Sequence, residues 1–146
     1  MQILQNIHSI FATMAQQEHN VIDNACGAVA RIMYAHCNKI PLEQIFPNFL
    51  AALPLREDYQ ENEPVFNCIL FLFGSGNAVA GKYIKQIFSL FGRVIGPRAV
   101  GGVNSTLQAQ IIQQLQQFKM VFADQFSQVV NSLTADEKQA ILSSLQ

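Results

Sequence analysis

The densest group of ionisable side chains in this 146-residue chain is a run of acids just before a strongly apolar segment. Glu57, Asp58, Glu61 and Glu63 bring four of the ten acidic residues into positions 57–63. Carboxylates at this density can attract and orient Lys and Arg side chains, with more effect on encounter rate and specificity than on affinity. Alternatively, they are solvated turn residues that match the positive end of a helix dipole. The residue types alone leave both interpretations open.

No other residues have the spacing of a catalytic or metal-binding site. The histidines, His8, His19 and His36, show no i, i+4 pairing that would suit a metal ion. Three cysteines without a CxxC pair argue against a disulfide framework and a zinc site, and free thiols fit a reducing compartment. No Ser/His/Asp or Cys/His group can be proposed, and no glycine-rich phosphate loop follows a strand. We therefore expect no cofactor and no enzyme activity.

The charge of the chain is uneven, although its net charge is only −1. Positions 64–123 carry five bases and no acid, and four of these bases are Lys82, Lys85, Arg93 and Arg98. Nearby aromatic residues fall on the apolar stripe, so a solvated helix face is favoured over a nucleic-acid site. The longest apolar run is far shorter than the ~20 residues of a membrane span. We expect no direct contact with nucleic acid or membrane.

Apolar residues recur at helical spacing along the whole chain, without the period-2 alternation of strands, and predict an all-α fold. The expected helices span about 2–17, 21–37, 41–53, 62–73, 78–95, 105–118, 121–132 and 135–145.

The most apolar of these helices directly follows the acids. Asn62 is expected as its N-cap, two residues before Pro64. Its apolar positions predict a buried centre of the protein, formed by Phe66, Ile69, Leu70 and Phe73.

Two later helix starts have the capping-box pattern. These are Ser105-x-x-Gln108 and Thr134-x-x-Glu137.

The expected helices form about four pairs in a single domain, near 2–38, 41–76, 78–119 and 121–146. The pairs begin at intervals of 39, 37 and 43 residues, which is typical of HEAT or armadillo repeats stacked into an α-α superhelix. A plain helical bundle would give a similar pattern.

Two stretches carry a resemblance to a known family. They are DNACGAVAR at 23–31 and LPLRED at 53–58, the second followed by Glu61 and Asn62. They resemble, in order and spacing, the DNA-x-GA-x-AR segment and the LPL-[KR]-x-D…EN turn near the C-terminus of importin-β (karyopherin-β) nuclear transport receptors. Residues 133–145 look like the closing helix of those receptors. Within the family, the resemblance is nearest to the importin-4 branch.

The resemblance implies a HEAT-repeat superhelix in which the second helix of each pair lines the concave side. It also implies that the chain is a C-terminal fragment of a receptor that shuttles between cytoplasm and nucleus. Basic cargo, such as histones or ribosomal proteins, would be expected at Glu57, Asp58, Glu61 and Glu63. Ran GTPase and nucleoporins would be partners of the full-length receptor, with Ran-GTP bound mainly by N-terminal repeats. The alternative is a HEAT scaffold or adaptor unrelated to transport.

Structural roles are expected for the polar residues of the first stretch. Asp23 and Asn24 would cap their helix and bond across to the next turn. Arg31 would pair with an acid of the adjacent repeat and form a ladder between repeats.

Overall fold

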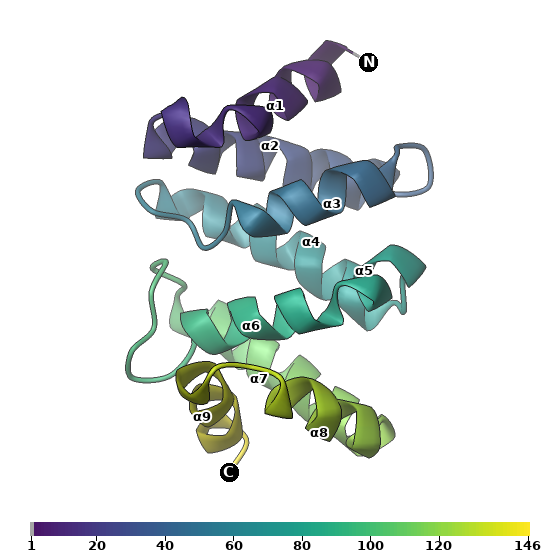
Figure 1. Cartoon of the computed structure of the whole chain (residues 1–146), viewed down its shortest axis with the longest axis vertical. Coiled ribbons are helices and arrows are strands. Elements are labelled where there is room, and N and C mark those ends of the chain that lie inside the picture. The colour runs from purple at the N-terminus through teal and green to yellow at the C-terminus, as the bar shows by residue number, and fades with distance from the viewer. Residues whose placement is uncertain (1) are drawn as a thin grey trace.

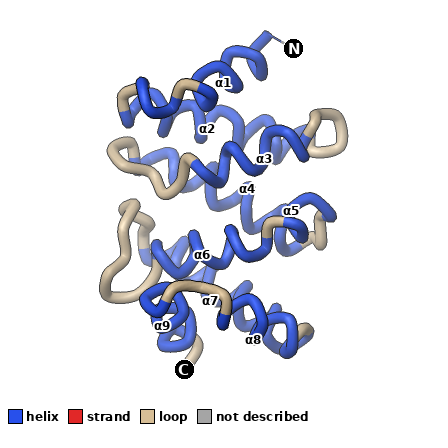
Figure 2. The backbone as a smooth tube through the Cα atoms, in the orientation of Figure 1, coloured by secondary structure: helices blue, strands red, loops and turns tan. Residues whose placement is uncertain are grey.

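The computed structural model describes residues 2–146, and over that range it contains nine α-helices, two short 3-10 helices and no strand (Figure 2). The all-α prediction is confirmed. The α-helices are α1 (Gln2–Ala12), α2 (His19–His36), α3 (Leu42–Ala51), α4 (Asn62–Gly74), α5 (Ala78–Lys82), α6 (Ile84–Val94), α7 (Ser105–Val121), α8 (Ala123–Asn131) and α9 (Ala135–Ser144). The 3-10 helices are η1 (Met14–Gln16) and η2 (Tyr59–Glu61).

The helices stack in two layers along the long axis of the molecule, and the two termini lie at opposite ends (Figure 1). Helices α1, α3, α5, α6 and α8 form the nearer layer in this view, whereas α2, α4 and α7 form the layer behind. The α2–α4 contact is the most extensive between helices, and α4 in turn contacts α7. This is a helical-repeat solenoid, in which each unit is stabilised by its neighbours. Helix α9 packs mainly on α6, at the C-terminal end of the stack.

Helix α4 lies at the centre of the stack and is buried on most of its circumference. Phe66, Ile69 and Leu70 are buried, as the apolar pattern predicts. The prediction is wrong for Phe73, which is only half-buried, although it lies where α4 meets α6 and α7. Its ring packs at 5.8, 6.2 and 5.4 Å, centroid to centroid, against the rings of Phe88, Phe91 and Phe118, respectively.

The prediction of a single helix over 78–95 is wrong, because the helix is broken at Tyr83 into α5 and α6. The backbone of Tyr83 leaves the helical region, with φ −111° and ψ 25°. Its ring packs against Phe46 of α3 at 6.1 Å. Gly81 lowers the helix propensity just before the break. The contact of Tyr83 with Phe46 therefore outweighs only a weak local preference for a continuous helix.

The two predicted capping boxes differ in outcome. Thr134 and Glu137 form the predicted reciprocal box at the start of α9. Helix α7 is capped one residue earlier than predicted, because Asn104 Oδ1 accepts the backbone N–H of Leu107 at 2.9 Å. The side chain of Gln108 instead donates to the carbonyl of Val103.

Candidate functional site

The four acids lie where the α3–α4 turn enters α4, and we call this group the acidic corner (Glu57, Asp58, Glu61 and Glu63). Its backbone is held by Asp23, which is only 1% exposed on α2. Asp23 Oδ2 accepts the backbone N–H groups of Arg56, Glu57 and Asp58 at 3.0, 2.7 and 2.8 Å. Hydrogen bonds to an ionised acceptor are stronger than neutral ones, so one carboxylate fixes the path of the turn.

Neither Asp23 nor Asn24 caps α2, because the helix begins at His19, earlier than the sequence predicts. Asp23 therefore lies in the second turn of the helix and faces the following repeat unit rather than its own N-terminus. Asn24 is exposed, and its Nδ2 donates to the carbonyl of Asn20 at 2.7 Å.

Asn62 is the first residue of α4 and not its predicted N-cap. The N-cap position is Glu61, whose side chain makes no capping hydrogen bond. Asn62 is buried, and its Nδ2 donates at 2.7 Å to the carbonyl of Gly101 in the α6–α7 loop. The side chain is turned toward this loop, which explains why it does not cap its own helix. Gly101 has a φ of 85°, a conformation that favours glycine.

Arg31 and Glu61 connect α2 to the acidic corner. The Nη1 of Arg31 lies 3.0 Å from Oε2 of Glu61, and the Glu61 side chain is only 16% exposed. Glu61 lies directly over Gly27, where an added Cβ would overlap the carboxylate. Glu61 is thus the acid of the corner that is already neutralised and enclosed, and Gly27 leaves the space for it.

The other three acids of the corner are more accessible. Glu57 and Glu63 are exposed, and Asp58 is half-buried. Glu57 Oε1 lies 3.7 Å from Nδ1 of His19, whose Nε2 is 3.1 Å from the Arg56 guanidinium. The acidic corner therefore presents three carboxylates to solvent, those of Glu57, Asp58 and Glu63. The backbone of the turn that carries them is fixed by Asp23 of α2.

The four basic residues weighed above as a nucleic-acid site are exposed, and two of them pair with acids. They are Lys82, Lys85, Arg93 and Arg98. Lys82 forms an ion pair with Glu43, and this hydrogen bond and charge raise the pKa of Lys82. Arg98 lies 3.6 Å from Asp136. These pairings fit the expected solvated helix faces better than a continuous basic surface.

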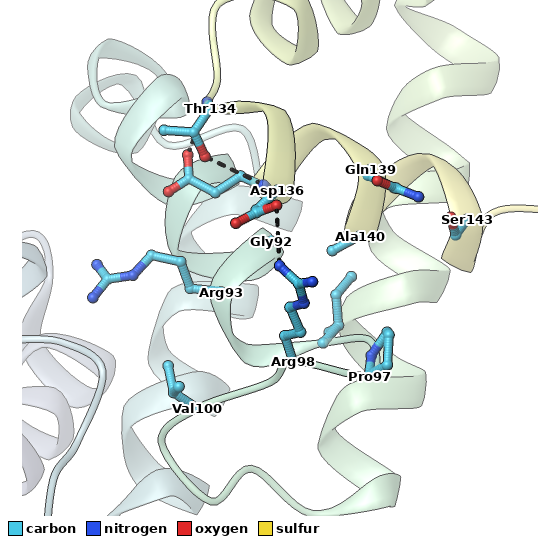
Figure 3. Close-up of a pocket in the computed structure, with 12 residues that line it drawn as sticks. Gly92, Arg93, Pro97, Arg98, Val100, Thr134, Asp136, Gln139, Ala140 and Ser143 are labelled. Atoms are coloured by element: carbon cyan, nitrogen blue, oxygen red, sulfur yellow. Dashed lines mark hydrogen bonds and ion pairs between the residues drawn. The ribbon is translucent and has the colours of Figure 1, made fainter.

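A pocket of about 660 Å³ lies between the end of α6, the following loop and α9. In the close-up, Arg98 reaches across this pocket toward Asp136, whereas Arg93 points away from both (Figure 3). Gly92 lets the two helices approach, since an added Cβ would be 2.8 Å from the Glu137 carbonyl oxygen. The Arg98–Asp136 pair already balances charge in the pocket.

The thiols of Cys26 and Cys68 are buried and therefore unreactive. Desolvation raises the pKa of Cys26 to about 12, with smaller contributions from the charges of Asp23 and Glu61. Desolvation likewise raises the pKa of Cys68 to about 12, with a smaller contribution from Cys37. At neutral pH both are therefore protonated core residues rather than nucleophiles.

Within residues 2–146, no group of three or more His, Cys, Asp or Glu side chains is placed to hold a metal ion. Over the same range, every helix is too short or too polar to cross a bilayer.

Together, the stacked helix layers and the contacts from each unit to the next define a helical-repeat protein. No family model matches the chain. The chain is similar to the probable importin subunit beta-4 of Schizosaccharomyces pombe, with 26% identity over 132 residues, or 90% of the chain. It is also similar to importin-4 of Homo sapiens, with 26% identity over 133 residues. It spans about 12% of the length of each relative. The chain is thus similar to a short segment of these two importins.

Proposed function

We propose that this chain forms the C-terminal helical repeats of a nuclear import receptor and takes part in binding basic protein cargo. The observation that carries the proposal is the similarity to two importins over 90% of the chain, together with the helical-repeat fold. In the full-length receptor, Ran GTPase and nucleoporins would bind through other repeats. The receptor would shuttle between the cytoplasm and the nucleus.

The acidic corner is the surface that we assign to cargo, such as Lys- and Arg-rich segments of histones or ribosomal proteins. Glu57, Asp58 and Glu63 supply the accessible carboxylates, whereas Glu61 contributes less because Arg31 already pairs with it. Asp23 holds the backbone of the turn in place before any ligand arrives. A preorganised site loses less conformational entropy when it binds, which supports recognition by only a few charges.

A peptide titration tests the proposal. The chain is titrated against a fluorescein-labelled histone-tail peptide, and fluorescence anisotropy reports binding. The control is the same peptide with every Lys and Arg replaced by Gln. We expect saturable binding of the basic peptide that weakens as salt rises from about 0.05 to 0.3 M, because screening acts over ~8 Å at physiological ionic strength.

Equal binding of the basic and the Gln-substituted peptides would contradict the proposal. Absence of binding by both peptides would also contradict it, and a scaffold role unrelated to basic cargo would then be favoured.

A further inference from the structure

A second recess lies on the layer formed by α2, α4 and α7, and its residue Asn67 lies one helical turn along α4 from Glu63 of the acidic corner. It has a volume of about 410 Å³, and we call it the amide groove. One wall is formed by glutamines of α7, and the other by Tyr34 of α2 with Asn67 and Phe71 of α4. The described residues that line the groove include no charged side chain. The groove itself therefore offers hydrogen-bonding and apolar contacts rather than ion pairs.

The glutamine wall has a regular spacing. Gln110, Gln113, Gln114 and Gln117 follow the i, i+3, i+4, i+7 pattern and line the same groove. Residues four apart on a helix are displaced by about 6 Å along its axis. An extended peptide repeats every two residues, or about 6.6 Å. Each glutamine offers a donor and an acceptor, which are the complements of a peptide C=O and N–H.

One glutamine is already fixed in the groove. Gln114 Nε2 donates to the carbonyl of Leu70 on α4 at 3.1 Å. Gly74 leaves the space for this contact, since an added Cβ would be 2.6 Å from the same nitrogen. The bond connects α7 to α4 and sets the position of the glutamine wall. Gln113 and Gln117 are exposed beside it and can turn toward a ligand.

The opposite wall offers a place for an apolar side chain. The rings of Tyr34 and Phe71 lie 4.9 Å apart, centroid to centroid, and are tilted by 51°. They are 53% and 41% exposed, respectively, although both are large aromatic residues. Such a pair provides rigid contact area, and the tyrosine hydroxyl adds a polar group at its edge.

We propose that the amide groove binds an extended, uncharged peptide segment of a partner protein. The primary amides of α7 would hydrogen-bond the main chain of the peptide, and the Tyr34–Phe71 pair would hold one apolar side chain. The groove adjoins the acidic corner along α4, but its lining residues and its proposed ligand differ from those of the corner, so the inference does not rest on the proposed receptor function. Main-chain recognition by neutral groups gives binding that tolerates sequence variation and salt.

The probe is a fluorescein-labelled, end-capped peptide of Ser, Thr and Gly with one central Leu. A second copy carries methyl groups on alternate backbone nitrogens, which removes those donors without changing the side chains. We expect the unmethylated peptide to bind the chain saturably, with less than about a twofold change in Kd between about 0.05 and 0.5 M salt. We expect the methylated peptide to bind about tenfold more weakly, as for the loss of two ordinary hydrogen bonds.

The matched variants are Gln113→Ala with Gln117→Ala in the groove, and Gln116→Ala on the exposed face of the same helix. The groove double variant should lose about tenfold in affinity, whereas Gln116→Ala should change it less than twofold. Phe71→Ala should weaken the Leu peptide and leave a copy with Gly in place of Leu unaffected.

Several results would overturn the inference. These are no binding of the uncharged peptide, equal binding of its methylated copy, or equal losses for the groove and control variants. Tighter binding of a Lys/Arg-rich peptide or of single-stranded DNA, sensitive to the groove variants, would assign the surface to a charged partner instead.

Discussion

The carboxylate of Asp23 on α2 accepts the backbone N–H of Glu57, 34 residues later in the chain, at 2.7 Å. Asn62 makes an analogous contact one unit further on, since its Nδ2 reaches the carbonyl of Gly101. In both cases a buried side chain near the start of a helix binds the backbone of a connection in the next unit, the α3–α4 turn for Asp23 and the α6–α7 loop for Asn62. The turns of successive units are thus held by side chains of the preceding unit as well as by contacts between the loops themselves.

Removal of the Asp23 carboxylate should destabilise the protein. Asp23→Ala leaves three backbone N–H groups without their charged acceptor, so we expect the free energy of unfolding to fall by about 2–3 kcal/mol. Urea denaturation followed by circular dichroism measures this change. The neighbouring exposed residue provides the control, because Asn24→Ala should change the value by less than about 0.5 kcal/mol. An Asp23→Ala variant as stable as the control would show that the turn holds its own conformation.

Gly27 and Glu61 should be energetically coupled. Gly27→Ala places a Cβ where the Glu61 carboxylate lies, so Glu61 must move and lose its contact with Arg31. We expect the double variant Gly27→Ala/Glu61→Ala to be more stable than the sum of the single changes predicts, by about 1 kcal/mol. Additive effects in this double-mutant cycle would refute the steric coupling.

Phe66 and Phe71 lie on the same helix but should respond differently to truncation. Phe66 is fully buried, so Phe66→Ala should cost ~3–5 kcal/mol, a large part of the ~5–15 kcal/mol stability of a typical domain. Phe71 is 41% exposed, so Phe71→Ala should cost less than about 1.5 kcal/mol, including its contact with Tyr34. Thermal unfolding of both variants checks this order, and a reversed order would contradict the assigned core.

Cys26 and Cys68 should make stability fall at alkaline pH. Their pKa values are raised from the ordinary 9.0 to about 12 in the folded protein. Above pH 9 the unfolded chain loses these protons first, so the folded state binds more protons and the free energy of unfolding falls as pH rises. The contribution is fully present below pH 9 and is lost progressively toward pH 12.

A Cys26→Ala/Cys68→Ala variant should show a shallower decline in stability between pH 9 and pH 10.5 than the parent chain. Denaturant titrations across this range measure the slope. Thiol labelling of the folded chain gives an independent check, because the two buried cysteines should react only after unfolding. Equal slopes for the two proteins would contradict the assigned burial of these thiols.

The helical architecture could be predicted from the sequence because the apolar stripes persist from one end of the chain to the other. The predictions that were wrong concern features that depend on contacts between residues distant in sequence. The break at Tyr83 follows a contact with Phe46, and Asn62 turns toward Gly101 instead of capping α4. In both cases the local residue types suit the predicted role, and a tertiary contact overrides them.

The candidate site, too, could be predicted from the sequence only in part. The density of acids at positions 57–63 is visible in the sequence, but their unequal accessibility depends on Arg31 and Gly27 in a separate helix. The polar face of α7 is also evident as a run of glutamines. Its position beside Tyr34 and Phe71 emerges only when α2, α4 and α7 are placed together.

Charge reversal at the three accessible acids of the acidic corner tests whether it binds basic cargo. Glu57, Asp58 and Glu63 are changed to Lys, and Glu61 is kept because it is packed over Gly27. The control reverses three acids elsewhere and gives the same change in net charge. The control positions are Glu43, Asp124 and Asp136, all in first turns of other helices.

After circular dichroism confirms folding, each protein is titrated with the labelled histone-tail peptide at low and physiological salt. We expect the corner variant to lose about tenfold in affinity at low salt and less at physiological salt, as for three surface charges. The control variant should lose less than about threefold from the change in overall charge. Equal affinities of the corner variant and the parent chain, or equal losses in the corner and control variants, would contradict the account.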